Sequence, residues 1–111
     1  MRHSRLAALR TRASVFAALG DETRLSVLAR LTKGEPQSIA RLTEGTSLTR
    51  QAVTKHLHVL AEAGLLRNVR VGRENRFALN PRPLARARDY LDEVSHQWDD
   101  ALARLKAYVE R

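Results

Sequence analysis

The sequence predicts a mainly α-helical domain that carries one β-hairpin, an α+β fold with the order α-α-α-α-β-β-α. Its 111 residues suit a single domain and are too few for two. Apolar residues recur every three or four positions along most of the chain, which is the period of an α-helix. After Gly64, and as far as Leu79, the period changes to two, the period of a β-strand. We therefore expect residues 1–111 to form one domain.

The first two helices are predicted from apolar spacing and from the residues that end or begin a helix. Residues 1–14 form a basic N-terminal arm that runs into the first helix, and Gly20 ends that helix. Its apolar positions are Leu6, Leu9, Val15, Phe16 and Leu19. Asp21 is a favourable N-cap for a second helix, which the segment 33–36 ends. The apolar face expected on this helix consists of Leu25, Leu28 and Leu31.

A short helix, a tight turn and a longer helix follow. Ser38 caps the short third helix, and residues 44–46 make the turn. Thr49 begins a fourth helix that extends to about Ala63. Leu48 and Val53 have the spacing of a hydrophobic staple across its start. This is the layout of a helix-turn-helix, in which the second helix reads DNA.

A β-hairpin is predicted after Gly64. Val69 and Val71 are expected on one face together with Phe77 and Leu79, across a turn at residues 72–75. The alternating arginines would then point away from that face, and we predict a hairpin with one apolar and one basic side.

The last helix begins at Asn80-Pro81, an N-cap residue followed by proline at the first helical position. Its apolar residues step by three and four alternately, as in a heptad seam. These residues are Leu84, Ala87, Leu91, Val94, Trp98, Ala101, Leu105 and Tyr108.

The charge of the chain indicates a polyanionic partner. Twenty Lys and Arg against twelve Asp and Glu give a net charge of +8, and seventeen of the twenty are arginine. The entire excess lies in residues 1–80. Arginine binds phosphate oxygens bidentately, and the low aromatic content of 5% favours duplex DNA over stacking on single-stranded bases. The chain has no cysteine, which excludes disulfides and thiolate metal sites, and no apolar run is long enough for a membrane helix.

The fourth helix carries the predicted base-reading side chains. At about 100° per residue, Val53, Leu57 and Leu60 face the core and the polar residues face outward, with His56 at the boundary. Glutamine and lysine read base edges, and an arginine at the helix start favours phosphate. The candidate contacts are Arg50, Gln51, Thr54, Lys55, His56 and His58. The alternative is an ordinary solvated face of an amphipathic helix.

The hairpin supplies a second set of predicted DNA contacts, which would make it the wing of a winged helix-turn-helix. These candidates are Arg67, Arg70, Arg73, Asn75 and Arg76. They would meet the phosphate backbone or enter the minor groove. The alternative is a set of charges that protects a sheet edge against aggregation.

Three segments together resemble the ArsR-type winged helix-turn-helix repressors. They contain Asp-x-Thr-Arg-Leu at 21–25, Ala-Val-x-Lys-His-Leu at 52–57 and Leu-x-x-Ala-Gly-Leu-Leu at 60–66, and the match extends from about residue 15 to 84. The resemblance implies a prokaryotic, cytoplasmic, homodimeric regulator that binds an operator, usually as a repressor released by an inducer. It also implies that the first and last helices form the dimer interface. The candidate interface residues are Leu6, Leu9, Phe16, Leu91, Val94, Trp98 and Leu105.

The sensor of the family is not evident in this chain. The cysteine pair of the metal-sensing members is absent, and the last helix offers one imidazole among carboxylates. These residues are Asp89, Asp92, Glu93, His96, Asp99 and Asp100. Because arginines lie among them, we interpret these acidic residues as members of solvated ion pairs. We therefore expect the protein to bind no metal and no cofactor. Whether a small molecule acts as an effector stays an open question at this point.

The sequence contains no motif of a catalytic site, so we expect that the protein is not an enzyme. The alternative to a DNA-binding regulator is a winged-helix protein–protein adaptor.

Overall fold

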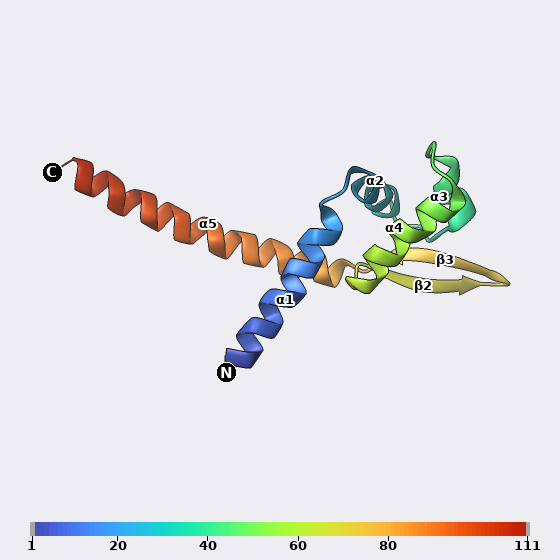
Figure 1. Ribbon diagram of the computed structural model, residues 1–111, viewed down its shortest axis with the longest axis horizontal. Coiled ribbons are helices and arrows are strands. Elements are labelled where there is room, and N and C mark those ends of the chain that lie inside the picture. The colour runs from blue at the N-terminus through green and yellow to red at the C-terminus, as the bar shows by residue number, and fades with distance from the viewer. Residues whose placement is uncertain (1, 111) are drawn as a thin grey trace.

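The computed structural model describes residues 2–110, with side chains from Arg5 onward. Five helices and a three-stranded antiparallel sheet follow one another as α1 (Arg2–Leu19), α2 (Glu22–Leu31), β1 (Gln37–Ser38), α3 (Ile39–Glu44), α4 (Arg50–Glu62), β2 (Leu66–Val71), β3 (Glu74–Leu79) and α5 (Pro81–Val109). The predicted order of four helices, hairpin and helix is confirmed, and the fold is a winged helix (Figure 1). Met1 and Arg111 lie outside the described residues.

Four of the helices begin where a short polar side chain caps them, as the sequence predicts. Each cap accepts a hydrogen bond from a backbone N–H in the first turn, at 3.0 Å for Asp21 and 3.1 Å for Thr49. These caps satisfy N–H groups that have no partner within the helix. The four capping residues are Asp21, Ser38, Thr49 and Asn80.

The sheet contains one strand that the sequence did not predict. The two-residue strand β1 pairs with the outer edge of β3, opposite Phe77 and Arg76, so the sheet order is β1-β3-β2. Two residues are too few to show an alternating pattern, which is why β1 escaped sequence analysis. The strand anchors the start of α3 to the hairpin.

The register of the hairpin corrects the predicted faces. The loop is the two-residue turn Gly72-Arg73, with Val71 opposite Glu74 and Val69 opposite Arg76. Directly opposed residues lie on the same face of a sheet, so Val69 and Val71 do not share a face with Phe77 and Leu79. When a hairpin loop contains an even number of residues, each odd-numbered residue of one strand lies opposite an even-numbered residue of the other. The prediction did not take this into account. Gly72 has φ +62°, as the first position of a type II′ turn requires.

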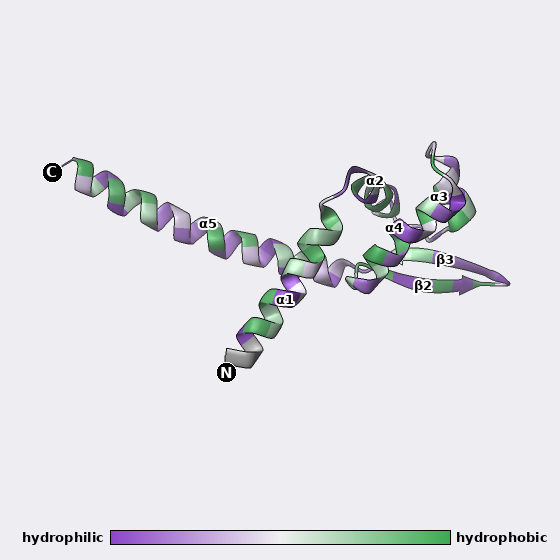
Figure 2. Cartoon of the chain, viewed as in Figure 1, coloured by the Kyte–Doolittle hydropathy of each residue, from purple (hydrophilic) through white to green (hydrophobic). Residues whose placement is uncertain are grey.

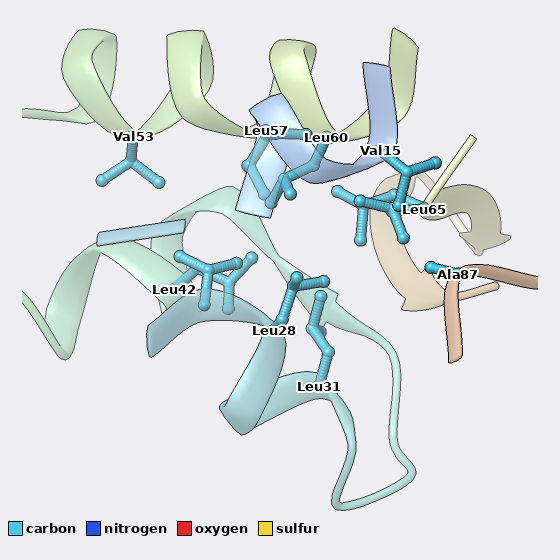
Figure 3. Packing of buried hydrophobic residues seen from close by; sticks show 12 residues of the cluster. Val15, Leu28, Leu31, Leu42, Val53, Leu57, Leu60, Leu65 and Ala87 are labelled. Atoms are coloured by element: carbon cyan, nitrogen blue, oxygen red, sulfur yellow. The ribbon is translucent and has the colours of Figure 1, made fainter. Parts of the chain in front are cut away.

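The core lies between α1, α2, α3, α4 and the base of the hairpin (Figure 3). Its fully buried residues include Leu42, Val53, Leu57, Leu60 and Leu65.

One predicted core position of α2 is wrong. Leu25 is 51% exposed, whereas Val27, Leu28 and Leu31 are buried. At 3.6 residues per turn, Leu25 lies about 110° from the middle of that buried face.

Helix α5 begins against the body and then leaves it. It packs against α1, and the rings of Phe16 and Tyr90 lie 6.0 Å apart at this crossing. Beyond the crossing the helix projects freely and gives the chain a longest extent of 67 Å (Figure 1). Figure 2 shows that apolar residues continue along the projecting part. Within residues 2–110, none of the helices is long and apolar enough to cross a membrane.

Candidate nucleic-acid interface

The start of α4 presents four of the predicted base-reading or phosphate-binding side chains together. All four are exposed and they line one shallow hollow of the surface. The opposite face of α4 is held in the core by Val53, Leu57 and Leu60, which are at most 2% exposed. The four outward residues are Arg50, Gln51, Thr54 and Lys55. The angular prediction from the sequence therefore agrees with the structure at these positions.

The local structure favours an anion at this end of α4. Thr49 caps the helix, and the first turn contains no acidic residue that would oppose a phosphate. The Thr54 hydroxyl donates to the Arg50 carbonyl at 2.7 Å. Its proton is therefore engaged, and its oxygen remains able to accept a hydrogen bond from a base edge.

The two histidines of α4 have different surroundings. His58 is exposed, and its Nε2 lies 3.0 Å from the Glu62 carboxylate one turn further on. His56, predicted at the boundary and included among the DNA contacts, is turned toward α2 instead. Its Nδ1 lies 3.7 Å from the Asp21 carboxylate and 3.3 Å from an Arg24 guanidinium nitrogen.

Arg24 links three helices beneath the outward face. Its guanidinium donates to the Ala18 carbonyl at 2.6 Å and to the Ala17 carbonyl at 3.2 Å, which satisfies carbonyls at the C-terminal end of α1. The same side chain reaches His56 on α4. Sequence analysis assigned Arg24 no role of its own, although its helical position places it on the buried face of α2. The Arg24 network therefore joins the end of α1 to α4 through α2.

Asp21 completes this network. The backbone N–H of Arg24 lowers the pKa of the Asp21 carboxyl below its usual value, and the positive charges of His56 and Arg24 act in the same direction, with desolvation opposing. The ionised carboxylate is therefore the form that the folded chain favours.

The hairpin carries its cations on both faces rather than on one. Cross-strand pairing places Arg70 with Asn75 on one face, and Arg67 and Arg76 on the other. Arg73 lies in the turn at the tip. The basic face predicted from the sequence is therefore wrong in its geometry, because the parity of the register separates Arg70 from Arg76.

Most of these wing residues are free to meet DNA. Arg67, Arg70, Arg73 and Asn75 are exposed. Arg76 is less available, since its Nε donates to the Glu74 carboxylate at 2.7 Å. The hairpin extends from the body on the side away from the free end of α5 (Figure 1).

The predicted interface residues divide into two groups. Phe16 and Val94 are half-buried, and Phe16 packs on Tyr90 within the chain. The others are large apolar side chains with 45–65% of their surface exposed, and Leu102 on α5, which sequence analysis missed, joins them at 58%. The exposed predicted residues are Leu6, Leu9, Leu91, Trp98 and Leu105.

The acidic face of α5 was weighed as a metal site from the sequence. Residues 2–110 contain no group of three or more His, Asp or Glu placed to hold a metal ion together. Asp89 lies 3.9 Å from the guanidinium of its neighbour Arg88, and both side chains of this ion pair are exposed.

Comparison with known proteins identifies the family. Residues 19–69 match a family model described as a helix-turn-helix domain. The HTH-type transcriptional regulator YuzN of Bacillus subtilis (strain 168) is 38% identical over 77 aligned residues, covering 64% of this chain and 84% of YuzN.

Solved structures of other regulators share the fold. An ArsR-like transcriptional regulator from Rhodococcus sp. RHA1 is 38% identical, with a TM-score of 0.81 over 90% of this chain and 93% of its own. The homodimeric winged helix-turn-helix DNA-binding domain of Mb0332 from Mycobacterium bovis is 22% identical, with a TM-score of 0.68 over 87% of this chain and 89% of its own. The second likeness shows the fold alone. The chain therefore belongs to the ArsR-like family of winged helix-turn-helix transcriptional regulators.

Proposed function

We propose that this protein is a homodimeric repressor that binds an inverted-repeat operator in double-stranded DNA. The observation that carries the proposal is the cluster Arg50, Gln51, Thr54 and Lys55, exposed together at the start of α4. Within the part of the chain that the structure describes, neither Arg50 nor Lys55 has an ion-pair partner. Their charges are therefore available to phosphates and base edges.

The roles within the proposed interface differ by chemistry. Gln51 and Lys55 can read base edges in the major groove, and Arg50 at the helix start favours a phosphate. On the wing, Arg70 and Arg73 are exposed and meet the backbone of the flanking DNA. The His58 ring contacts the Glu62 carboxylate, and His56 faces α2, so we assign neither a principal contact.

Dimerisation through α1 and α5 follows from the exposed apolar side chains on these helices. Monomers seldom leave a continuous apolar stripe of this kind in water, and a two-fold interface is the commonest way to cover one. The homodimeric state of the M. bovis domain, which shares the fold, supports a dimer. Light scattering after size exclusion should give about 25 kDa, twice the chain mass of 12.5 kDa. A mass of one chain at micromolar concentration would refute the dimer.

A symmetric dimer dictates the form of the operator. Two α4 helices related by a two-fold axis enter successive major grooves, so half-site centres should lie about 10 base pairs apart or at a multiple of that spacing. The test is to incubate the purified protein with fragments of the genome that encodes it and to sequence the retained DNA. We expect an inverted repeat at this spacing. Retained fragments without a shared motif would indicate an electrostatic DNA binder, and no retention would favour a protein–protein adaptor.

Repression is tested separately, because the same complex can block or recruit RNA polymerase. The retained site is placed within a promoter that drives a reporter. We expect expression to fall when the protein is present, because a dimer bound there excludes the polymerase. A rise in expression would assign activation instead.

A further inference from the structure

A cavity of about 530 Å³ lies between α1, the C-terminal end of α4 and the start of α5. Its apolar floor includes Val15 and Ala87, which are 3% and 4% exposed and lie near each other at the edge of the core in Figure 3. Ala63 and Gly64 contribute the wall that belongs to the end of α4. The volume falls in the range of roughly 300–1,000 Å³ that is usual for small-molecule sites.

The polar part of the lining carries only positive formal charge. Arg12, Arg82 and Arg86 line the cavity, and no acidic residue does. The guanidinium of Arg12 lies over the Tyr90 ring at 5.4 Å, which holds it in place. Its Nε is buried and has no hydrogen-bond partner among the described residues. Buried polar groups in native proteins nearly always have a partner, and an acceptor bound beside Arg12 would supply one.

We propose that this cavity binds a small organic anion with a carboxylate and an apolar body. A carboxylate accepts two parallel hydrogen bonds from a guanidinium, and the start of the 29-residue helix α5 adds the positive end of its dipole. The apolar body then covers Val15, Pro83 and Ala87. This ligand class matches both halves of the lining, whereas a cation would face three arginines.

The position of the cavity gives the anion a regulatory role, which rests on the proposed function. On α1, Ala8, Arg12 and Val15 line the cavity, while Leu6 and Leu9 lie on the other, exposed side of the same helix, which is assigned to the dimer. The opposite wall is the end of α4. An anion bound here changes the packing of α1 against α4, and with it the spacing of the two α4 helices in the dimer.

Binding is tested on the full chain without DNA. The probes are benzoate, phenylacetate and octanoate, each compared with its uncharged amide by calorimetry and thermal shift. We expect at least one carboxylate to bind about tenfold or more tightly than its amide, because the charge-assisted hydrogen bonds are lost in the amide. If none of the three carboxylates binds at millimolar concentration, the proposed site is wrong.

Variants locate the binding. Arg12→Gln and Arg86→Gln should each weaken the best carboxylate by about tenfold. Arg88→Gln, an exposed arginine of the same helix that does not line the cavity, should leave binding unchanged. Arg12→Gln also removes the contact with Tyr90 and can disturb folding, so a second variant tests the same site. Thr11 is exposed at the cavity, and Thr11→Phe should block the binding of every probe. Equal effects of Arg88→Gln and Arg86→Gln would overturn the assignment to this cavity.

Coupling is then measured with the DNA retained in the genomic experiment. The bound carboxylate should change DNA affinity by about fivefold or more, and the amide should not. A carboxylate that binds without this change overturns the regulatory role and leaves the site standing. Failure to retain DNA in the absence of any probe overturns the proposed function and leaves the binding result unaffected.

Discussion

Helices α4 and α5 both have an apolar face, but the chain covers that face fully only on α4. Val53, Leu57 and Leu60 are at most 2% exposed, whereas Leu91 and Trp98 on α5 are 53% and 65% exposed. The uncovered side of α4 is polar and basic, whereas α5 leaves an apolar face uncovered as well as its polar one. The proposed partners follow from these uncovered faces: a polyanion for α4, and a second copy of the chain for α5.

The largest predicted effect concerns the free face of α5. Trp98→Ala combined with Leu105→Ala should weaken the dimer by roughly a thousandfold, since symmetry makes four truncations of about 1 kcal/mol or more each. Sedimentation velocity over a concentration series measures this change, and DNA affinity should fall with it. Asp92→Ala combined with His96→Ala, on the opposite face of the same helix, should leave the mass at two chains. A dimer that survives the first pair would place the interface elsewhere.

The covered face of α4 should respond through stability instead. Leu57→Ala deletes a buried side chain and should lower the free energy of unfolding by about 2–5 kcal/mol. Val59→Ala, on the same helix but 38% exposed, should have a much smaller effect. Urea denaturation of the dimer at fixed concentration compares the two. If both variants lost a similar free energy of unfolding, the packing described for α4 would be wrong.

The outward face of α4 should respond through DNA affinity alone. Gln51→Ala and Lys55→Ala should each cost about 1–3 kcal/mol on the operator and leave the free energy of unfolding nearly unchanged. Lys106→Ala, an exposed lysine near the end of α5, is the matched control and should not alter the affinity. Fluorescence anisotropy with a labelled operator gives the values. A loss from Lys106→Ala as large as that from Lys55→Ala would mean that only total charge matters.

Elements and caps were predictable because their signals are local. Asp21, Thr49 and Asn80 each stand directly before the helix that they cap, and the apolar spacing of α4 separated its two faces correctly. What failed depends on partners far away in the sequence. The face of Arg70 depends on the register of the whole hairpin, and β1 exists only because β3 lies beside it.

The same distinction explains the site residues. Gln51 and Lys55 were placed correctly because helical geometry alone turns them outward. His56 could not be placed, since its direction depends on Arg24 and Asp21, which precede it by more than 30 residues. The apolar face of α5 was recognised from its heptad spacing, but only the structure shows where it leaves the body.

The smallest predicted effect concerns the Arg24 network. Because the folded chain lowers the pKa of Asp21, this carboxylate stabilises the fold above the pKa of the unfolded chain, and the contribution is lost as the pH falls through the folded value. Asp21→Asn keeps an N-cap but cannot titrate. The difference in melting temperature between the natural protein and Asp21→Asn should therefore shrink as the pH falls below about 4. A difference that does not change with pH would show that the charge of Asp21 has no part in the network.

A salt titration of DNA binding tests most directly whether α4 reads sequence while the wing supplies charge. Arg73→Gln on the wing should weaken operator and random duplex about equally, and should lower the slope of log affinity against log salt by about two per dimer. Gln51→Ala should weaken the operator by about 1–3 kcal/mol, leave random DNA unchanged and keep the slope. Equal losses from Gln51→Ala on both duplexes would reduce α4 to an electrostatic surface and contradict the account.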